Sequence, residues 1–315
     1  MSLTSPRLSI RELDPNPPTE EHKASIADGG RRRHLSWGMD FDTRSIILRT
    51  EVDGHLEENV KEVLLNSKKD IRDSLVREYG EYAIEEKVGN FVAIDTKPFS
   101  TLAYHNQFFD QVRRAFVIGA YYPALVGACA MGERILNHLL LDLRGFYKQT
   151  PEYRRVFKKD SFDDWRVPIN ALETWGILLP KAVIEFRQLM SLRHRSIHFN
   201  ASTYNSLRDD ALSAILHMRT IIELQFGTFT DAPWFIPGTK GHCFIKKEYE
   251  THPFVKTYFL PKCPFVGPLF AMDFNVGGWR FFDMENYGAG SWTDEEFAKQ
   301  YNDRDPEMVV KPTVI

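Results

Sequence analysis

The sequence predicts an α+β protein that is mainly helical and is built around an antiparallel four-helix bundle. Residues 99–230 hold four long amphipathic segments, separated by prolines, glycines and capping residues. Residues 37–98 and 231–315 contain short apolar runs that are typical of strands. With 315 residues the chain is about twice the usual length of one domain, so a bundle and two smaller parts fit.

The composition is typical of a soluble globular protein. Hydrophobic residues make up 43% and charged residues 26% of the chain, which excludes general disorder, collagen and a coiled-coil rod. The formal net charge of -3 excludes a generally polybasic nucleic-acid binder, so any anion site must be local. Three cysteines give neither an even disulfide framework nor a CxxC pair, which predicts a reducing, cytoplasmic compartment.

The uncharged segment 115–132 is close to the length of a membrane span. Three glycines dilute its apolar residues, and Pro123 lies in the middle of the run. We therefore expect two soluble helices that meet at a turn, and no membrane partner.

Residues 1–36 are expected to form a flexible tail, because they contain four prolines and a glycine pair but little apolar content. The basic run at residues 31–33 could contact RNA, but such a run in a tail is more often solvated.

Residues 37–98 are expected to form a small α/β cap on the bundle. Predicted strands at residues 45–49 and 91–94 flank a predicted helix. The apolar stripe of that helix consists of Leu56, Val60, Val63, Leu64, Ile71 and Leu75.

The first half of the bundle is a predicted helical hairpin. Ser100 is a candidate N-cap for a helix over about 102–120, and Gly119 marks the end of that helix. Pro123 suits the first turn of a second helix, whose apolar stripe follows the 3.6-residue period as far as Leu143. The two helices must fold back on each other.

The second half of the bundle begins with a short predicted helix at residues 168–175. Pro180 then opens a third long helix, and a fourth runs over about 206–226. Four amphipathic helices joined in this way make an antiparallel bundle, which we assign to residues 99–230.

Residues 231–315 are expected to form a β-rich subdomain, because prolines alternate there with apolar runs. Strands are predicted within 254–259 and 265–274. Thr293 and Glu296 have the spacing of a capping box and are predicted to open a final helix.

The strongest functional pattern is a basic segment between Phe186 and Arg208 that contains no acidic residue. Arginine offers a planar fork of donors that suits phosphate, and histidine exchanges protons near neutral pH. Together these side chains suit phosphodiester chemistry. The basic residues of the segment are Arg187, Arg193, His194, Arg195, His198 and Arg208.

Two other interpretations of this segment stay open. His194 and His198 are four residues apart and would share one helix face, as pairs of metal ligands do. Arg193 and Arg195 oppose a divalent cation there, and no acidic residue is near in sequence. Alternatively, both histidines are surface residues at a helix end, where cations complement the helix dipole.

Residues 193–198 (RHRSIH) resemble the ribonuclease motif of the HEPN family, in which an arginine and a polar residue are followed, after a short gap, by a histidine. His194 occupies the polar position, which is usually Asn, Asp or His in the family. Upstream, residues 109–114, 119–125 and 133–136 are similar to the first helical hairpin of HEPN domains. The resemblance covers about residues 100–228.

This resemblance implies a metal-independent endoribonuclease that needs no cofactor and works as a homodimer, with the motifs of two chains facing each other. Cleavage by the RNA's own 2′-hydroxyl requires a base, an acid and a cation for the charge on the phosphorane. Each chain supplies one His198 for proton transfer, so two chains supply both base and acid. Arg193 would steady the phosphate, and His194 would orient the partner groups.

Other polar residues have supporting roles in this prediction. Glu133 and Asn137 could orient His198, although hydrogen bonds within the bundle are the alternative. Arg193 and His198 lie about 140° apart on an ideal helix, so the helix must end or loosen before both can face one phosphate. The expected RNA-binding residues are Arg195, Arg187, Arg208 and Asn200.

In biological terms, we expect a toxin or antiviral defence effector, with RNA as its substrate and an antitoxin or regulatory protein as its partner. The alternative is a non-catalytic HEPN bundle that binds a nucleotide or a protein partner. A zinc site in the C-terminal part is not expected, since the candidate ligands follow no known finger spacing. Those candidates are His242, Cys243, His252 and Cys263.

Overall fold

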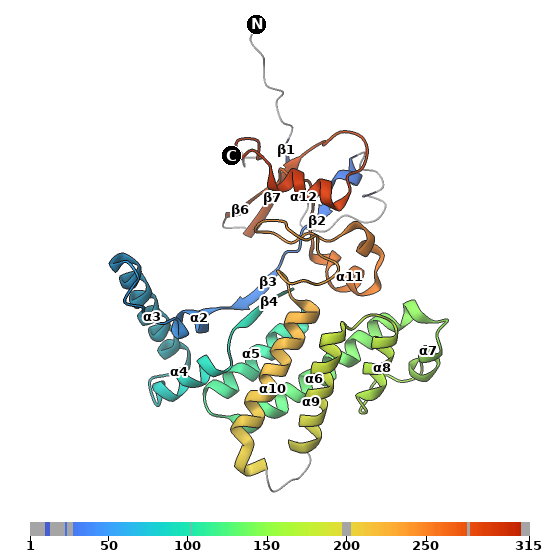
Figure 1. Cartoon of the computed structure of the whole chain (residues 1–315). Helices are drawn as coiled ribbons and strands as arrows, with labels where there is room; N and C mark the ends of the chain where they lie inside the picture. Colours follow the sequence, from blue (N-terminus) through green and yellow to red (C-terminus); the bar gives the residue numbers. More distant parts are fainter. Residues whose placement is uncertain are drawn as a thin grey trace. The chain divides into compact units, whose positions relative to one another are not determined.

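The chain divides into two compact units, one from residues 1–38 and 228–315 and the other from residues 39–227. Helices dominate, and the strands that can be assigned form one three-stranded and two two-stranded sheets (Figure 1). The mainly helical α+β class is therefore confirmed. The computed structural model describes residues 10–12, 23, 28–101, 103–196, 203–275 and 278–309.

The unit of residues 39–227 is largely helical. Its elements, in chain order, are β3 (Met39–Asp42), α2 (Arg44–Arg49), α3 (Glu58–Tyr79), α4 (Ile84–Ala93), β4 (Lys97–Thr101), α5 (Tyr104–Val117), α6 (Tyr121–Leu143), the 3-10 helix η2 (Arg144–Tyr147), α7 (Pro151–Val156), α8 (Arg166–Thr174), α9 (Pro180–Ser196) and α10 (Thr203–Phe226).

All the helices predicted between residues 99 and 230 are present, as α5, α6, α8, α9 and α10. Gly119 lies in the turn between α5 and α6 with a φ of 81°, in the left-handed region that favours glycine. Pro123 lies in the first turn of α6, and Pro180 is the first residue of α9. The positions of the glycine and the two prolines therefore predicted these helix ends correctly.

Ser100 is not the N-cap of α5, which corrects the prediction from sequence. It is a buried residue of β4, and its hydroxyl accepts a hydrogen bond from the Asn106 side chain (3.1 Å). At the start of α5, the side chain of Asn106 instead accepts a hydrogen bond from the backbone N–H of Ala103 (2.7 Å).

The long helices of this unit pack on one another. α5 lies against α6, and α10 lies against both α6 and α9 (Figure 1). One apolar side of α6 is buried along its whole length. Its buried residues are Ala124, Leu125, Ala128, Cys129, Met131, Gly132, Ile135, Leu136, Leu139, Leu140 and Leu143.

Among the described residues, one helical stretch, Tyr121–Tyr147, is long and apolar enough to cross a membrane. More than half of its most apolar window, 56%, is buried inside the unit, as is typical of a core helix.

Two predicted strands of the N-terminal cap are wrong. Residues 44–49 form α2, and residues 91–93 belong to α4. The Asp42 carboxylate accepts a hydrogen bond from the backbone N–H of Arg44 (3.0 Å), which favours the start of a helix. A short apolar run does not by itself distinguish a helix from a strand. The strands of this region are β3 and β4, which pair antiparallel.

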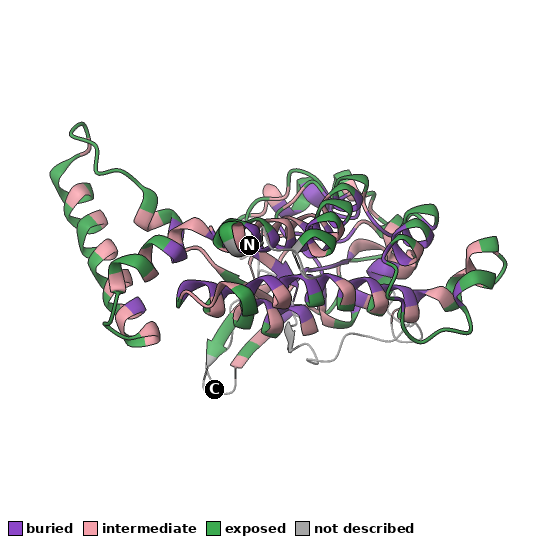
Figure 2. Cartoon of the chain, turned by 90° about the horizontal axis from the view of Figure 1, so that it is seen from below, coloured by how far each residue is buried: buried purple, intermediate pink, exposed green. Residues whose placement is uncertain are grey.

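α3 confirms the helix predicted between these segments, but its apolar stripe is only partly buried. Leu75 is the buried residue of this helix, whereas Val60 and Val63 are open to solvent. In Figure 2, α3 is accordingly drawn mostly in the colours of exposed and intermediate residues.

The other unit combines small sheets with short helices. Its strands are β1 (Ile10–Glu12), β2 (Arg33–His34), β5 (Phe265–Val266), β6 (Ala271–Asn275) and β7 (Gly278–Met284). β7 pairs antiparallel with both β1 and β6, and β2 pairs antiparallel with β5. Its helices are α11 (Pro253–Tyr258), α12 (Asp294–Asn302) and the 3-10 helices η1 (Gly29–Arg31), η3 (Lys247–Thr251) and η4 (Leu260–Lys262).

The core of this unit joins its N-terminal and C-terminal parts. Leu35 is fully buried among side chains from residues 236–301. The other buried members of the cluster are Ile236, Phe244, Val266, Phe270, Phe281, Phe297, Ala298 and Tyr301.

The C-terminal part confirms one prediction and corrects another. The capping box opens α12: Thr293 accepts a hydrogen bond from the backbone N–H of Glu296, whose carboxylate accepts one from the N–H of Thr293. The strand predicted at residues 254–259 is instead α11, because Pro253 at the first helical position favours a helix and removes a ladder donor. Less of this part is β structure than the sequence indicated.

The predicted flexible tail is wrong for residues 28–36. Arg32 and Arg33 are fully buried, and the Arg32 guanidinium lies between the carboxylates of Asp28 and Asp283. Arg33 donates a hydrogen bond to Asp294 (2.6 Å). Arg32 and Arg33 of the basic run are therefore internal parts of the fold and are not solvated.

Candidate functional site

The motif begins in the last turn of α9. Arg193 and His194 lie there, and α9 is described as Pro180–Ser196. His198 and Asn200, two of the predicted site residues, lie outside the described residues. The described part of the site consists of Arg193, His194 and the side chains that surround them.

Arg193 is held by a carboxylate and an indole. Its Nη2 lies 3.1 Å from Oε2 of Glu133 on α6, and the same oxygen accepts a hydrogen bond from Nε1 of Trp165 (3.2 Å). The guanidinium carbon lies 5.7 Å from the centre of the Trp165 ring, within the range of a cation–π contact. The Arg193 side chain remains 22% exposed, so it is oriented by its neighbours and still reaches solvent.

A glycine permits this arrangement. A Cβ atom at Gly132 would lie 2.7 Å from the Trp165 ring and 2.8 Å from Leu189 of α9. Only a residue without a side chain lets α6 approach Trp165 and α9 so closely. The neighbouring Glu133 is thereby placed beside Arg193.

Asn137 is a structural residue in this chain. Its Oδ1 accepts a hydrogen bond from the backbone N–H of Phe162 (2.8 Å), and its Nδ2 donates to the carbonyl oxygen of Glu133 (2.9 Å). The Asn137 amide therefore connects α6 to the loop that precedes α8. Of the two residues considered for orienting the motif, Glu133 contacts it, whereas Asn137 makes the hydrogen bonds within the bundle.

Arg195 joins the end of α9 to α10. Its Nη2 lies 2.7 Å from Oδ1 of Asp210, a buried carboxylate that also accepts a hydrogen bond from Ser206 (2.9 Å). The Arg195 side chain is 61% exposed, so it keeps donors available to a ligand.

Arg187 and Arg208 have their contacts elsewhere in the unit. Arg187 pairs with Glu173 of α8 (2.6 Å). Arg208 donates to Oδ1 of Asn90 (3.1 Å), and its guanidinium lies over the ring of Phe116 (5.7 Å). No contact of either arginine with Arg193 or His194 is found in the described part of the chain, so the structure does not gather all the predicted RNA-binding residues around the motif.

The basic segment has no acidic residue in sequence, but the fold brings carboxylates to it. Glu133, Glu173 and Asp210 pair with three of its arginines. Asp164 lies near His194: hydrogen bonds from Arg166 lower the pKa of Asp164, and the charge of His194 adds to that lowering. The local positive charge is therefore smaller than the sequence suggests.

Sequence reasoning missed Trp165, Asp164 and Asp210 as neighbours of the motif. Asp164 and Trp165 precede the motif by nearly thirty residues, and no local pattern connects them to it. Asp210 lies one turn after Ser206 on the predicted fourth helix, so the sequence does contain the spacing that lets these two side chains form a hydrogen bond.

The described residues contain no group of three or more His, Cys, Asp or Glu side chains that could hold a metal ion. Two of the zinc candidates have other contacts: Nδ1 of His242 lies 2.5 Å from the Tyr301 hydroxyl, and Sγ of Cys243 accepts a hydrogen bond from the N–H of Phe229 (3.2 Å). Comparisons with protein-family models, with curated proteins and with solved structures give no match to this chain.

Proposed function

We propose that the protein is a metal-independent endoribonuclease of HEPN type, which cleaves RNA through attack by the 2′-hydroxyl. One observation carries this proposal: Arg193 is oriented by Glu133 and Trp165 in the last turn of α9, directly before the segment that contains His198. An oriented and part-exposed guanidinium suits stabilisation of charge at a phosphate, and a histidine five residues further along the chain suits proton transfer.

The roles of the motif residues follow from their chemistry. Arg193 uses one nitrogen on Glu133, and its other donors can bind the phosphate oxygens that gain charge in the transition state. His194 is exposed in the same turn and orients the reacting groups. His198 exchanges protons with the 2′-hydroxyl or with the leaving 5′-oxygen.

One chain supplies one motif histidine at position 198, and the reaction needs both a base and an acid. The proposal therefore includes a homodimer in which two motifs form one composite site around the scissile phosphate. In this proposal α5, α6, α9 and α10 are the four helices of the HEPN-like bundle. The packing of α5, α9 and α10 on α6 supports that assignment. A role as a toxin or defence effector, held in check by an antitoxin or regulatory protein, is consistent with such an activity.

The central test is His198→Ala. Purified wild type is expected to cleave a labelled single-stranded RNA, and the variant is expected to lose cleavage while keeping its unfolding midpoint. His55→Ala, which removes an exposed histidine outside the bundle, is the matched control and should cleave like wild type. Equal cleavage by His198→Ala and wild type, after removal of contaminating nuclease, would refute the proposed mechanism.

A chelator separates this mechanism from a metal-dependent one. Cleavage should continue in EDTA, because arginine and histidine supply the charge and the proton transfers. If EDTA stopped cleavage and Zn²⁺ or Mn²⁺ restored it, the pair His194 and His198 would be metal ligands instead.

The alternative, a non-catalytic bundle that binds a nucleotide or a protein partner, gives a different result. In that case wild type would not cleave RNA under any of these conditions, and substitutions in the motif would alter only the affinity for a ligand.

A further inference from the structure

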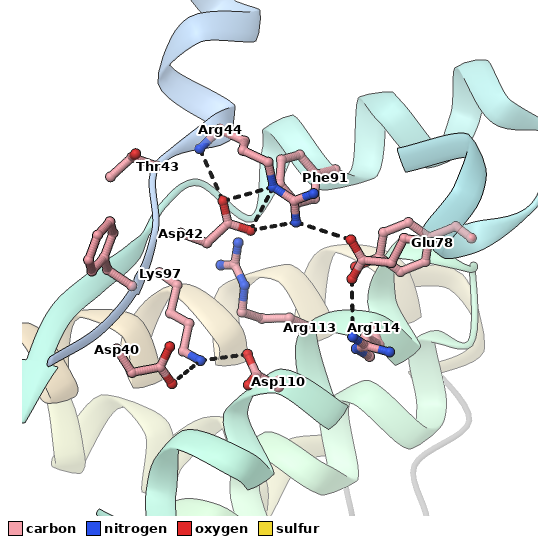
Figure 3. Close-up of a pocket in the computed structure, with 12 residues that line it drawn as sticks. Asp40, Asp42, Thr43, Arg44, Glu78, Phe91, Lys97, Asp110, Arg113 and Arg114 are labelled. Atoms are coloured by element: carbon pink, nitrogen blue, oxygen red, sulfur yellow. Dashed lines mark hydrogen bonds and ion pairs between the residues drawn. The ribbon is translucent and has the colours of Figure 1, made fainter. Parts of the chain in front are cut away.

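A second polar site lies in the unit of residues 39–227, in a cavity of about 430 Å³. It is formed where β3, α2, α3, α4, β4 and α5 meet, and it contains none of the motif residues discussed above. Figure 3 shows that cationic and acidic side chains from these elements point into one space. The charged residues are Asp40, Asp42, Arg44, Glu78, Lys97, Asp110, Arg113 and Arg114.

Most of these charges are paired in two groups. In one, Arg44 binds Asp42 (2.8 Å) and Glu78 (3.1 Å), and Glu78 also binds Arg114 (3.3 Å). These contacts fix one wall of the cavity.

In the other group, the buried amino group of Lys97 lies between two carboxylates. It binds Asp110 (2.6 Å) on α5 and Asp40 on β3. The antiparallel pairing of β3 with β4 brings Asp40 and Lys97 together. An ammonium group has three donors, so one donor of Lys97 remains for a ligand.

Arg113 differs from the other cations of the cavity. Its side chain extends between the two paired groups (Figure 3). Its guanidinium donates to the backbone carbonyl oxygens of Ile94 (3.3 Å) and Asp95 (2.9 Å), which are uncharged acceptors. Among the described residues, no carboxylate lies within ion-pair distance of it.

Arg113 is only 4% exposed, so the loss of hydration disfavours its charged form. Burial lowers the pKa of Arg113, and the charges of Asp42 and Asp110 act in the opposite direction. A buried cation without a direct counter-ion is costly unless an anion completes its surroundings. Because this cation lines a cavity, the missing anion can come from a ligand.

The carboxylates of the cavity restrict the chemistry of that ligand. Asp40 and Asp110 each accept one contact from Lys97, and a carboxylate has room for several more. A bare anion would be repelled by them, whereas hydroxyl groups on the same molecule would donate to them. The volume is within the usual range for a site that holds a small organic molecule.

We propose that this cavity binds a small hydroxylated organic anion of the sugar-phosphate type, with the anionic group on Arg113, Lys97 and Arg114 and the hydroxyl groups on Asp40 and Asp110. The proposal is independent of the ribonuclease activity. If the charged network served only to hold α2, α3 and α4 on α5, no such ligand would bind.

The test is calorimetric titration of the full chain with defined probes. Ribose 5-phosphate is expected to bind more tightly than inorganic phosphate or ribose alone, because only the first satisfies both the cations and the carboxylates. Gluconate replaces the phosphate by a carboxylate, so it identifies which anionic group the cavity prefers. Absence of binding by both ribose 5-phosphate and gluconate at millimolar concentration would overturn the proposal.

Substitutions then locate the binding. Arg113→Gln should abolish detectable binding of ribose 5-phosphate. Because Arg113 is buried, Arg114→Glu provides a second variant at a side chain that is 61% exposed, and reversing its charge should weaken binding by about tenfold.

Two controls complete the design. Arg72→Glu makes the same charge change at an exposed arginine of α3, outside the cavity, and should bind like wild type. Arg193→Gln, in the motif, should also retain binding, which separates this cavity from the RNA site. If Arg114→Glu bound the probe as tightly as Arg72→Glu, the cavity would not be the binding site.

Discussion

Two short basic runs in this chain differ in how far their charges are buried. The sequence predicts that the N-terminal triplet, Arg31, Arg32 and Arg33, is solvated, but Arg32 and Arg33 are fully buried and Arg31 is half-buried. The α9 cluster, Arg193, His194 and Arg195, is predicted to be a concentrated positive site, and it lies at a helix end where each arginine meets one carboxylate.

The difference lies in where the opposite charges are. Asp28 and Asp283, which bind Arg32, are as fully buried as the arginine itself. Glu133 beside Arg193 is 30% exposed, so this ion pair is accessible to water and to a competing phosphate. A buried pair is a structural feature that is costly to open, whereas a part-exposed pair can exchange its partner.

The largest effect should come from breaking the buried pair. Arg32→Ala leaves two buried carboxylates without their cation, so we expect a loss of about 3–5 kcal/mol in the free energy of unfolding, measured by urea denaturation. Arg72→Ala, which removes an exposed partner of Glu85, is the control and should leave the free energy of unfolding nearly unchanged. A loss for Arg32→Ala no larger than that of the control would show that the N-terminal triplet is not part of the core.

The second effect concerns the activity proposed for the α9 cluster. Arg193→Lys keeps the positive charge but loses the planar fork of donors, so binding of RNA at low salt should change little. Single-turnover cleavage should slow by about 10²–10³-fold, as when one donor is removed from a site that stabilises developing charge.

Arg187→Lys is the matched control for this experiment, because Arg187 pairs with Glu173 on α8 and has no contact with the motif among the described residues. It should cleave like wild type. If the Arg193→Lys variant also cleaved as fast as wild type, the α9 cluster would be left with a role in RNA attraction alone.

The third effect is a pH dependence located next to the N-terminal triplet. Burial, with a contribution from Lys23, lowers the pKa of His34 from 6.5 to about 3 in the folded protein. Between these values the unfolded chain takes up the proton more readily than the folded one. The free energy of unfolding should therefore fall as the pH drops from about 6.5 toward 3, by up to about 1.4 kcal/mol per pH unit from this residue.

His34→Gln removes this titration and should flatten the dependence of the urea midpoint on pH in that window. His55→Gln replaces an exposed histidine and accounts for general effects of acid. Parallel pH profiles for wild type and His34→Gln would contradict the assignment.

The smallest effect is expected for Arg195, whose side chain is 61% exposed although its partner Asp210 is buried. Arg195→Ala breaks the contact with Asp210, but Ser206 still donates to that carboxylate, so the loss in stability should be about 1 kcal/mol or less. A loss as large as that of Arg32→Ala would mean that both basic runs are structural.

Local patterns predicted the helices of residues 99–230 and the final helix α12 because each of them depends on nearby residues. Gly119 and Pro123 separate α5 from α6, Pro180 opens α9, and the Thr293–Glu296 capping box opens α12. The prediction failed where short apolar runs fit either structure, as at α2, α4 and α11, since tertiary contacts choose between helix and strand there.

The sequence by itself determined the mainly helical class and the positions of the long helices. Only the tertiary structure decided which charges meet. Glu133 and Trp165 reach Arg193, and Asp283 reaches Arg32, from positions far along the chain. Helix periodicity depends on residues three or four positions apart, so it can be recognised in the local sequence. The partner of a buried or part-buried charge depends on packing between distant segments, and no local pattern predicts that packing.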